Sequence, residues 1–263
     1  MTQDTYFRDH WVSVEPERIE TYEGLFQWRP EMEGLLTPAD LREGQIVVDY
    51  GCGPGHLSAE IARRVGPDGR VHAADINTEF LARTSERAEK DGIGERVETH
   101  ELVDERVPIE DHCVDRIVCK NVLEYVADLE ATVGEFKRLL RPGGIAHAID
   151  SDWGLLVVEP LGAERLDELM SAAKVAFKTP HAGRKLYGSF RQAGFGDVTV
   201  QVSVITDTVG FLLPILKNMA TYARVSGRLS EQAIDRCLED VQLGIQQKRH
   251  FALLPQFLVT ATA

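Results

Sequence analysis

The sequence has few cysteines and no long hydrophobic run. Its four cysteines form no Cys-x-x-Cys pair and are too sparse for a secreted disulfide framework, so we interpret them as free thiols. The longest apolar stretch, Val209 to Leu216, contains Pro214 and falls far short of the ~20 residues that cross a bilayer. The charged segment from Met1 to Arg29 has no apolar stretch that resembles a secretory signal. These absences predict a cytoplasmic protein with no membrane partner.

Positive charge is also scarce. The chain has 29 basic against 42 acidic side chains, and its formal net charge is -13. Such a chain repels phosphate backbones, which argues against nucleic acid as substrate or partner. With 263 residues, 43% of them hydrophobic, it is long enough for one large core, and we predict a single domain over residues 1–263.

Apolar runs alternate with amphipathic stretches from residue 45 onward. Buried strands are expected at 46–48, 70–75, 97–102, 114–119 and 145–149, with helices between them. This alternation predicts an α/β, doubly wound parallel sheet covered on both faces. Two further strands, at 198–204 and 251–259, would complete a mostly parallel seven-stranded sheet whose last strand is antiparallel.

Two segments lie outside this pattern. Residues 1–40 mix aromatic and charged side chains with three prolines, which indicates short helices that cover the core. Residues 206–249 look helical and separate the last two strands. Because so long an insert between paired strands is unusual, we predict that it is a lid or a partner surface.

The strongest functional signal is the segment Asp49-Tyr50-Gly51-Cys52-Gly53-Pro54-Gly55, which follows the first strand. Its glycines allow a sharp turn and a close approach of the backbone to a ligand. Asp75, at the end of the next strand, can accept hydrogen bonds from both hydroxyls of a ribose. The last glycine of a dinucleotide motif is replaced by His56, and no Tyr-x-x-x-Lys pair is present, which disfavours a dehydrogenase. S-adenosylmethionine suits the segment better, because it has no phosphates and its ammonium group can lie near Asp49.

On these motifs the chain resembles the class I S-adenosylmethionine-dependent methyltransferases, in the small-molecule group that includes the ubiquinone/menaquinone methyltransferases. The resemblance covers residues 44–152, with matches at 49–55, Asp75, 115–123 and 139–144. It implies a Rossmann-like methyltransferase fold and an enzyme that transfers a methyl group to an O, N, S or C nucleophile by in-line displacement. The residues that we assign to the S-adenosylmethionine site are Asp49, Tyr50, Gly51, Cys52, Gly53, Gly55, Asp75, Ile76, Asp104, Asn121 and Tyr22.

The small-molecule acceptor is expected beyond the fourth and fifth strands, because ligands of open parallel sheets occupy the carboxyl ends of the strands. The residues assigned to acceptor binding are Asp152, Trp153, Trp28 and Tyr222. The candidate catalytic groups, which could orient the acceptor or remove a proton from it, are Asp152, His181 and His250. No metal ligands are assigned, and Asn121, Asp150 and Asp152 are interpreted as ordinary polar residues of the loops.

Two other functions stay open. The chain could bind the same cofactor as an aid to a non-methylating reaction, such as a rearrangement or a decarboxylation. It could also be a non-catalytic cofactor-binding subunit whose helical insert is the partner surface. The sequence is compatible with a homodimer and leaves open the identity of the acceptor and of the methylated atom.

Overall fold

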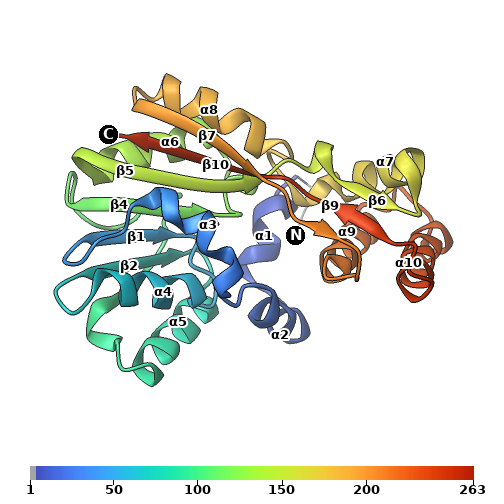
Figure 1. The fold of residues 1–263 in the computed structure, drawn as a ribbon, viewed down its shortest axis with the longest axis horizontal. Helices are drawn as coiled ribbons and strands as arrows, with labels where there is room; N and C mark the ends of the chain where they lie inside the picture. The colour runs from blue at the N-terminus through green and yellow to red at the C-terminus, as the bar shows by residue number, and fades with distance from the viewer. Residues whose placement is uncertain (1–3) are drawn as a thin grey trace.

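Seven strands form one mixed sheet in the order β3-β2-β1-β4-β5-β10-β7 in the computed structural model, which describes residues 4–263 (Figure 1). All of these strands run parallel except β10, which pairs antiparallel with both β5 and β7. This confirms the fold class predicted from the sequence. The strands are β1 (Ile46–Tyr50), β2 (Arg70–Asp75), β3 (Val97–Glu101), β4 (Val114–Lys120), β5 (Leu140–Ser151), β7 (Gly196–Ser203) and β10 (Gln256–Thr262).

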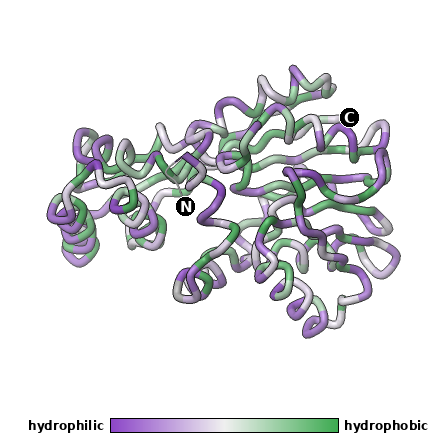
Figure 2. The backbone as a smooth tube through the Cα atoms, turned by 180° about the vertical axis from the view of Figure 1, so that it is seen from behind, coloured by the Kyte–Doolittle hydropathy of each residue, from purple (hydrophilic) through white to green (hydrophobic). Residues whose placement is uncertain are grey.

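Helices cover both faces of this sheet. On one face lie α4 (His56–Val65) and α5 (Thr78–Lys90), and on the other lie α6 (Leu129–Leu139) and α8 (Ala182–Gln192). The start of α5 is fixed by Asn77, whose Oδ1 accepts the backbone N–H groups of Glu79 and Phe80. Hydrophobic residues follow the strands of the larger sheet (Figure 2). Among residues 4–263, no helix is long and apolar enough to cross a membrane.

A second, smaller sheet forms a lobe beside the larger one (Figure 1). Its strands are β6 (Val157–Glu159), β9 (Phe251–Leu253) and β8 (Thr206–Asp207), in the order β6-β9-β8. They pack with α7 (Gly162–Ala173), α9 (Leu213–Ser226) and α10 (Glu231–Gln246) around a hydrophobic core that includes Trp153, Leu169 and Tyr222. The helices expected over 206–249 are therefore only part of a lobe that also takes up the chain after Trp153.

The segment 251–259 is divided between the two sheets. The prediction of a single strand there is wrong, because β9 pairs in the small sheet and β10 in the large one. Pro255 lies between them and has no N–H to donate to a ladder, so the pairing is interrupted there.

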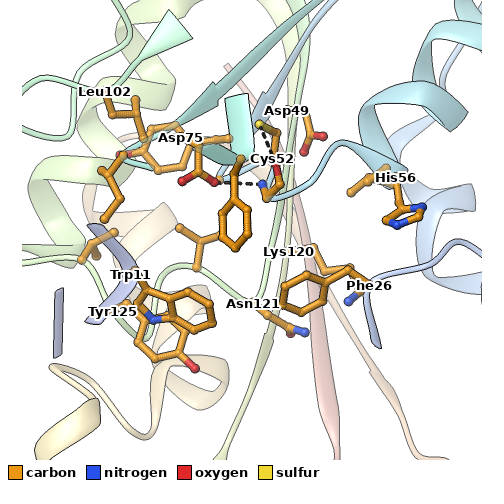
Figure 3. A pocket seen from close by; sticks show the side chains of 18 of the residues that line it. Trp11, Phe26, Asp49, Cys52, His56, Asp75, Leu102, Lys120, Asn121 and Tyr125 are labelled. Atoms are coloured by element: carbon orange, nitrogen blue, oxygen red, sulfur yellow. Dashed lines mark hydrogen bonds between the residues drawn. The ribbon is translucent and has the colours of Figure 1, made fainter. Parts of the chain in front are cut away.

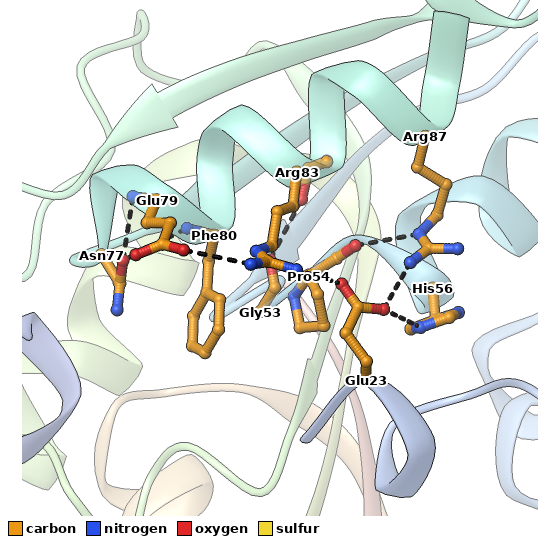
Figure 4. Close-up of polar contacts among 10 residues, drawn as sticks. Glu23, Gly53, Pro54, His56, Asn77, Glu79, Phe80, Arg83 and Arg87 are labelled. Atoms are coloured by element: carbon orange, nitrogen blue, oxygen red, sulfur yellow. Dashed lines mark hydrogen bonds and ion pairs between the residues drawn. The ribbon is translucent and has the colours of Figure 1, made fainter. Parts of the chain in front are cut away.

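The N-terminal residues form short helices between the sheet and the lobe (Figure 1). On α2, Glu23 Oε2 pairs with His56 Nε2 at 2.9 Å and with Arg87 Nη2 at 2.6 Å (Figure 4). These ion pairs fasten α2 to the start of α4 and to α5, so the helices lie over the Gly-rich loop. The N-terminal helices are α1 (Tyr6–Val12), α2 (Pro16–Leu25) and α3 (Glu33–Leu36). Short 3-10 turns lie at Pro30–Met32, Thr37–Ala39, Gly94–Arg96, Trp153–Leu155 and Lys174–Ala176.

Candidate active site

The Gly-rich loop leaves β1 at the carboxyl edge of the sheet. Gly51, Gly53 and Gly55 have φ angles of 75°, 55° and 82°, in the left-handed region that favours glycine. A Cβ added to Gly51 would lie 2.9 Å from Val122 Cγ1, and one added to Gly55 would lie 2.6 Å from Thr84 Oγ1. A Cβ on Gly53 would meet nothing closer than the ring of Phe26, at 3.7 Å. Gly51 and Gly55 therefore permit close packing within the protein, whereas a Cβ on Gly53 would make only ordinary contact.

Asp75 ends β2 beside this loop. Its Oδ2 accepts the N–H of Gly53 at 2.8 Å (Figure 3). Its Oδ1 accepts the N–H of Asn77 at 2.9 Å. The residue is only 8% exposed, and burial raises the pKa of its carboxyl to about 6. The carboxylate thus holds the loop in place and is also part of a cavity wall.

A first cavity lies over the ends of β1, β2 and β4, beneath the N-terminal helices (Figure 3). Most of the residues that the sequence assigned to the cofactor line it, and so does Trp28, which the sequence assigned to the acceptor. The predicted cofactor residues in its wall are Asp49, Tyr50, Gly51, Cys52, Gly53, Asp75, Ile76 and Asn121. Residues that the sequence analysis missed include Arg8, Trp11, Phe26, Leu102, Lys120 and Tyr125.

Three residues assigned to the cofactor do not line the first cavity. Gly55 instead forms the N-terminal cap of α4. Asp104 and Glu105 have φ angles of 50° and 61°, and this turn brings Glu105 rather than Asp104 to the wall. Tyr22 lies in the wall of the neighbouring cavity. The positive φ angles after β3 explain why counting along the sequence did not select the acid that lines the wall.

Two ionisable side chains, those of Asp49 and Lys120, line the first cavity. Asp49 is 1% exposed and accepts a hydrogen bond from Ser58 Oγ at 2.6 Å, and burial raises the pKa of its carboxyl to about 7. Lys120 is half-buried at the end of β4. Burial lowers the pKa of Lys120, and the carboxyl groups of Asp150, Asp49 and Glu124 oppose that effect.

A second cavity adjoins the first, between the sheet and the lobe. Two residues assigned to the acceptor, Trp153 and Tyr222, line it. Further apolar side chains come from β7, α9 and the segments around them, including Ile205, Phe211 and Met219. The cavities meet along five residues that line both: Trp11, Phe26, Lys120, Asn121 and Tyr125.

Glu124 places a buried carboxyl group in the wall of the second cavity. It is 2% exposed, and its Oε2 accepts the indole N–H of Trp153. Burial, followed by the neighbouring charge of Asp150, raises the pKa of Glu124 well above its usual range. The sequence analysis did not assign Glu124, although it lies just beyond the matched segment 115–123.

The three candidate catalytic residues lie outside both cavity walls. Asp152 is fully buried and forms ion pairs with Arg184 and, at 3.0 Å, with His181. Despite burial, which acts in the opposite direction, Arg184 and His181 lower the pKa of Asp152. His250 is buried within the lobe, where Nε2 lies 3.3 Å from Asp207 Oδ2. The partners of these residues give them a structural setting, and a catalytic or acceptor role for them stays a prediction.

Comparison with known proteins shows which families and sequences the chain resembles. Residues 41–194, more than half of the chain, match a family model described as "Methyltransferase domain". The ubiquinone/menaquinone biosynthesis C-methyltransferase UbiE of Klebsiella pneumoniae is 35% identical over 121 residues, which are 46% of this chain and 47% of that protein. The chain thus spans about half the length of this curated relative.

Solved structures extend the likeness to the whole fold. Phosphoethanolamine N-methyltransferase 2 of Haemonchus contortus, solved with phosphomonomethylethanolamine and S-adenosylhomocysteine, gives a TM-score of 0.65 at 17% identity over 100% of this chain and 60% of that one. The [4+2]-cyclase SpnF gives 0.56 at 17% identity over 88% of this chain and 80% of that one. At such identities the similarity concerns the fold alone. By the match over residues 41–194, the chain belongs to the methyltransferase-domain family, as its motifs predicted.

Proposed function

We propose that the protein transfers the methyl group of S-adenosylmethionine to a small-molecule acceptor. The observation that carries the proposal is the meeting of two cavities at the carboxyl edge of the sheet. One is bordered by Gly53 and Asp75, and the other is enclosed by the lobe. A donor and an acceptor placed in them would face each other across the five shared residues.

The wall of the first cavity fits S-adenosylmethionine. The carboxylate of Asp75 is suited to accept hydrogen bonds from two ribose hydroxyls, and the space beside Gly53 admits a ligand against the backbone. Asp49 supplies a carboxyl group for an ammonium, and Ile76 and Leu102 supply apolar surface for a base. When bound, S-adenosylmethionine supplies a methyl group that its positively charged sulfur already activates.

The chain's own contribution is to position the acceptor and to exclude water. Trp153, Tyr222 and Met219 give the second cavity a broad apolar surface, on which an apolar part of the acceptor can pack. Holding two reacting groups within ~3.5 Å and in line removes much of the entropic barrier of a bimolecular reaction. The five shared residues lie where the nucleophile of the acceptor would enter.

An experiment with labelled cofactor separates this function from its two rivals. The protein is incubated with a small-molecule extract and S-adenosylmethionine that carries a deuterated methyl group, and the products are analysed by mass spectrometry. The proposal predicts a product that carries the label with wild-type protein, and much less of it with Asp75→Ala when the cofactor is below saturation. Conversion of a compound without label would support a non-methylating reaction. Cofactor binding without conversion of any compound would support the non-catalytic subunit.

A further inference from the structure

Lys120 is an unpaired cation at the place where the two cavities meet. It ends β4 and lines both walls. Among the side chains that the structure describes, which do not include that of Glu17, none forms a hydrogen bond or an ion pair with its ammonium group. Other basic groups near the site are paired, as Arg87 is with Glu23 and Arg184 is with Asp152. Lys120 therefore differs from its neighbours in having no protein anion of its own.

The carboxyl groups around Lys120 are held by other donors. Asp49 accepts the hydroxyl of Ser58. Asp150 accepts the N–H groups of Leu123 and Ser151, at 2.8 Å and 2.9 Å. Glu124, as described above, accepts the indole N–H of Trp153. In their ionised forms these groups oppose the loss of charge by Lys120, but none forms a direct ion pair with it.

A cation that is partly removed from water is costly unless an anion compensates it. We propose that Lys120 binds an oxyanion of a ligand at the meeting point of the two cavities. The inference rests on the proposed function, which supplies two sources for that oxyanion. One is the carboxylate of the methyl donor in the first cavity. The other is an ionised hydroxyl or carboxyl group of the acceptor in the second cavity, which would restrict the acceptor to ionisable compounds with an apolar body.

Calorimetry with two nucleosides tests the first source. S-adenosylhomocysteine has the carboxylate, and 5′-methylthioadenosine keeps the nucleoside and the sulfur but lacks it. If Lys120 holds this carboxylate, Lys120→Met lowers the affinity for S-adenosylhomocysteine by about tenfold or more, the effect expected for a charged hydrogen bond. The affinity for 5′-methylthioadenosine stays unchanged. Lys90→Met, at the exposed end of α5, is the matched control and should bind both as the wild type does. Equal weakening of both nucleosides would mean a general disturbance and would overturn this assignment.

A phenolate tests the second source. Protein saturated with S-adenosylhomocysteine is titrated with 4-nitrophenolate at pH 8 and, in parallel, with uncharged nitrobenzene. If Lys120 holds an acceptor anion, 4-nitrophenolate binds the wild type, and its affinity falls by about tenfold or more in Lys120→Met. The affinity for nitrobenzene is the same in both proteins. If folded Lys120→Met matches the wild type with every ligand, the proposal fails. If the wild type binds neither nucleoside, the proposed function fails, and Lys120 is then judged by titrating the ligand-free protein and Lys120→Met with 4-nitrophenolate and nitrobenzene.

A second inference comes from a cluster outside both cavities. His72 on β2 pairs in register with Glu98 on β3, and His100 follows two residues later, so all three side chains lie on one face of the sheet. His72 Nδ1 lies 2.9 Å from His100 Nε2. The carboxylate oxygens of Glu98 lie 3.6 Å from His72 Nδ1 and 3.8 Å from His100 Nε2.

These separations suit a tetrahedral metal ion. With zinc–ligand bonds of about 2.0–2.1 Å, neighbouring ligand atoms lie about 3.3 Å apart. One ligand atom from each of the three residues lies within 4.8 Å of the other two, so a small movement of the exposed Glu98 side chain would bring one of its oxygens to that separation from both imidazoles. Burial lowers the pKa of both imidazoles, which favours the neutral form that a metal requires. The geometry points to a zinc-type divalent cation held by His72, Glu98 and His100, which would link the edge strand β3 to β2 and keep a fourth position for water.

Titration of the full chain with zinc alone, by calorimetry, tests this site. We expect one ion per chain and a loss of about tenfold or more in affinity for His72→Ala and for His100→Ala. His181→Ala, an exposed histidine on the other side of the active site, is the matched control and should bind as the wild type does. Urea unfolding without metal verifies that each variant is folded. Absence of zinc binding, or equal binding by all variants, would overturn the proposal, and neither result bears on S-adenosylhomocysteine.

Discussion

A methyl group added at Gly53 tests whether the loop binds a ligand, because it should affect ligand binding while the protein still folds. In Gly53→Ala the new Cβ would lie 3.7 Å from the Phe26 ring, which is ordinary contact, so the main cost to the fold is the left-handed φ of 55°. That cost is about 1–2 kcal/mol. The methyl group also fills space in the first cavity, and overpacking of a close contact costs about 1–3 kcal/mol. We expect the variant to fold and its affinity for S-adenosylhomocysteine to fall by roughly 5- to 150-fold.

Gly51→Ala is the matched control on the same loop. Its φ of 75° carries a similar strain, but its Cβ would lie 2.9 Å from Val122 Cγ1 and force the core to move. It should therefore lose about 1–3 kcal/mol more in free energy of unfolding than Gly53→Ala does. Urea unfolding and calorimetry measure the two effects. The reasoning is refuted if folded Gly53→Ala binds S-adenosylhomocysteine like the wild type, or if both variants lose the same stability.

Three carboxyl groups give further predictions. Asp75→Ala leaves the N–H groups of Gly53 and Asn77 without their acceptor, and calorimetry should show S-adenosylhomocysteine binding weakened by about 1.5–3 kcal/mol. Unchanged affinity in the folded variant removes this assignment. The pKa of Asp49 is about 7 in the folded protein and ~3.9 when unfolded, so its contribution to stability falls as the pH rises from about 4 to 7. Asp49→Asn should flatten that part of the urea-derived profile, and an unaltered slope contradicts the assignment. Asp152→Asn should lower the free energy of unfolding by about 1–3 kcal/mol and leave the affinity for S-adenosylhomocysteine unchanged, whereas the reverse pattern would return Asp152 to the site.

The larger sheet was predictable because its strands follow simple rules. Continuous apolar runs such as Ile46 to Val48 are typical of strands buried on both faces, and the turns between them contain glycine or proline. The first-cavity residues at the ends of β1 and β2 were predictable for the same reason, since parallel strands bring Gly53 and Asp75 to one edge.

The lobe was not predictable from these rules. Its short strands, such as Phe251–Leu253, pair with segments far away in the sequence, and their residue pattern looks like an extension of β10. Pro255 was the available signal, because it cannot donate to a ladder. The partners of two catalytic candidates were not predictable either. Asp207, which pairs with His250, and Arg184 on α8, which pairs with Asp152, lie far from them in the sequence.

The charged groups at the meeting point of the two cavities were also not predictable from the sequence. Lys120 and Glu124 look like ordinary polar residues at the end of a strand. Only the packing of Trp153 and of the N-terminal helices shows that both side chains lie in cavity walls.

The most direct measurement is a crystal structure of the protein grown with S-adenosylhomocysteine. We predict that the ligand occupies the first cavity, with its ribose hydroxyls at the Asp75 carboxylate and its amino-acid part beside Gly53, and that its sulfur faces the residues shared with the second cavity. Binding of the ligand elsewhere, or in the first cavity with its sulfur turned away from Lys120 and Asn121, would contradict a methyl transfer between the two cavities.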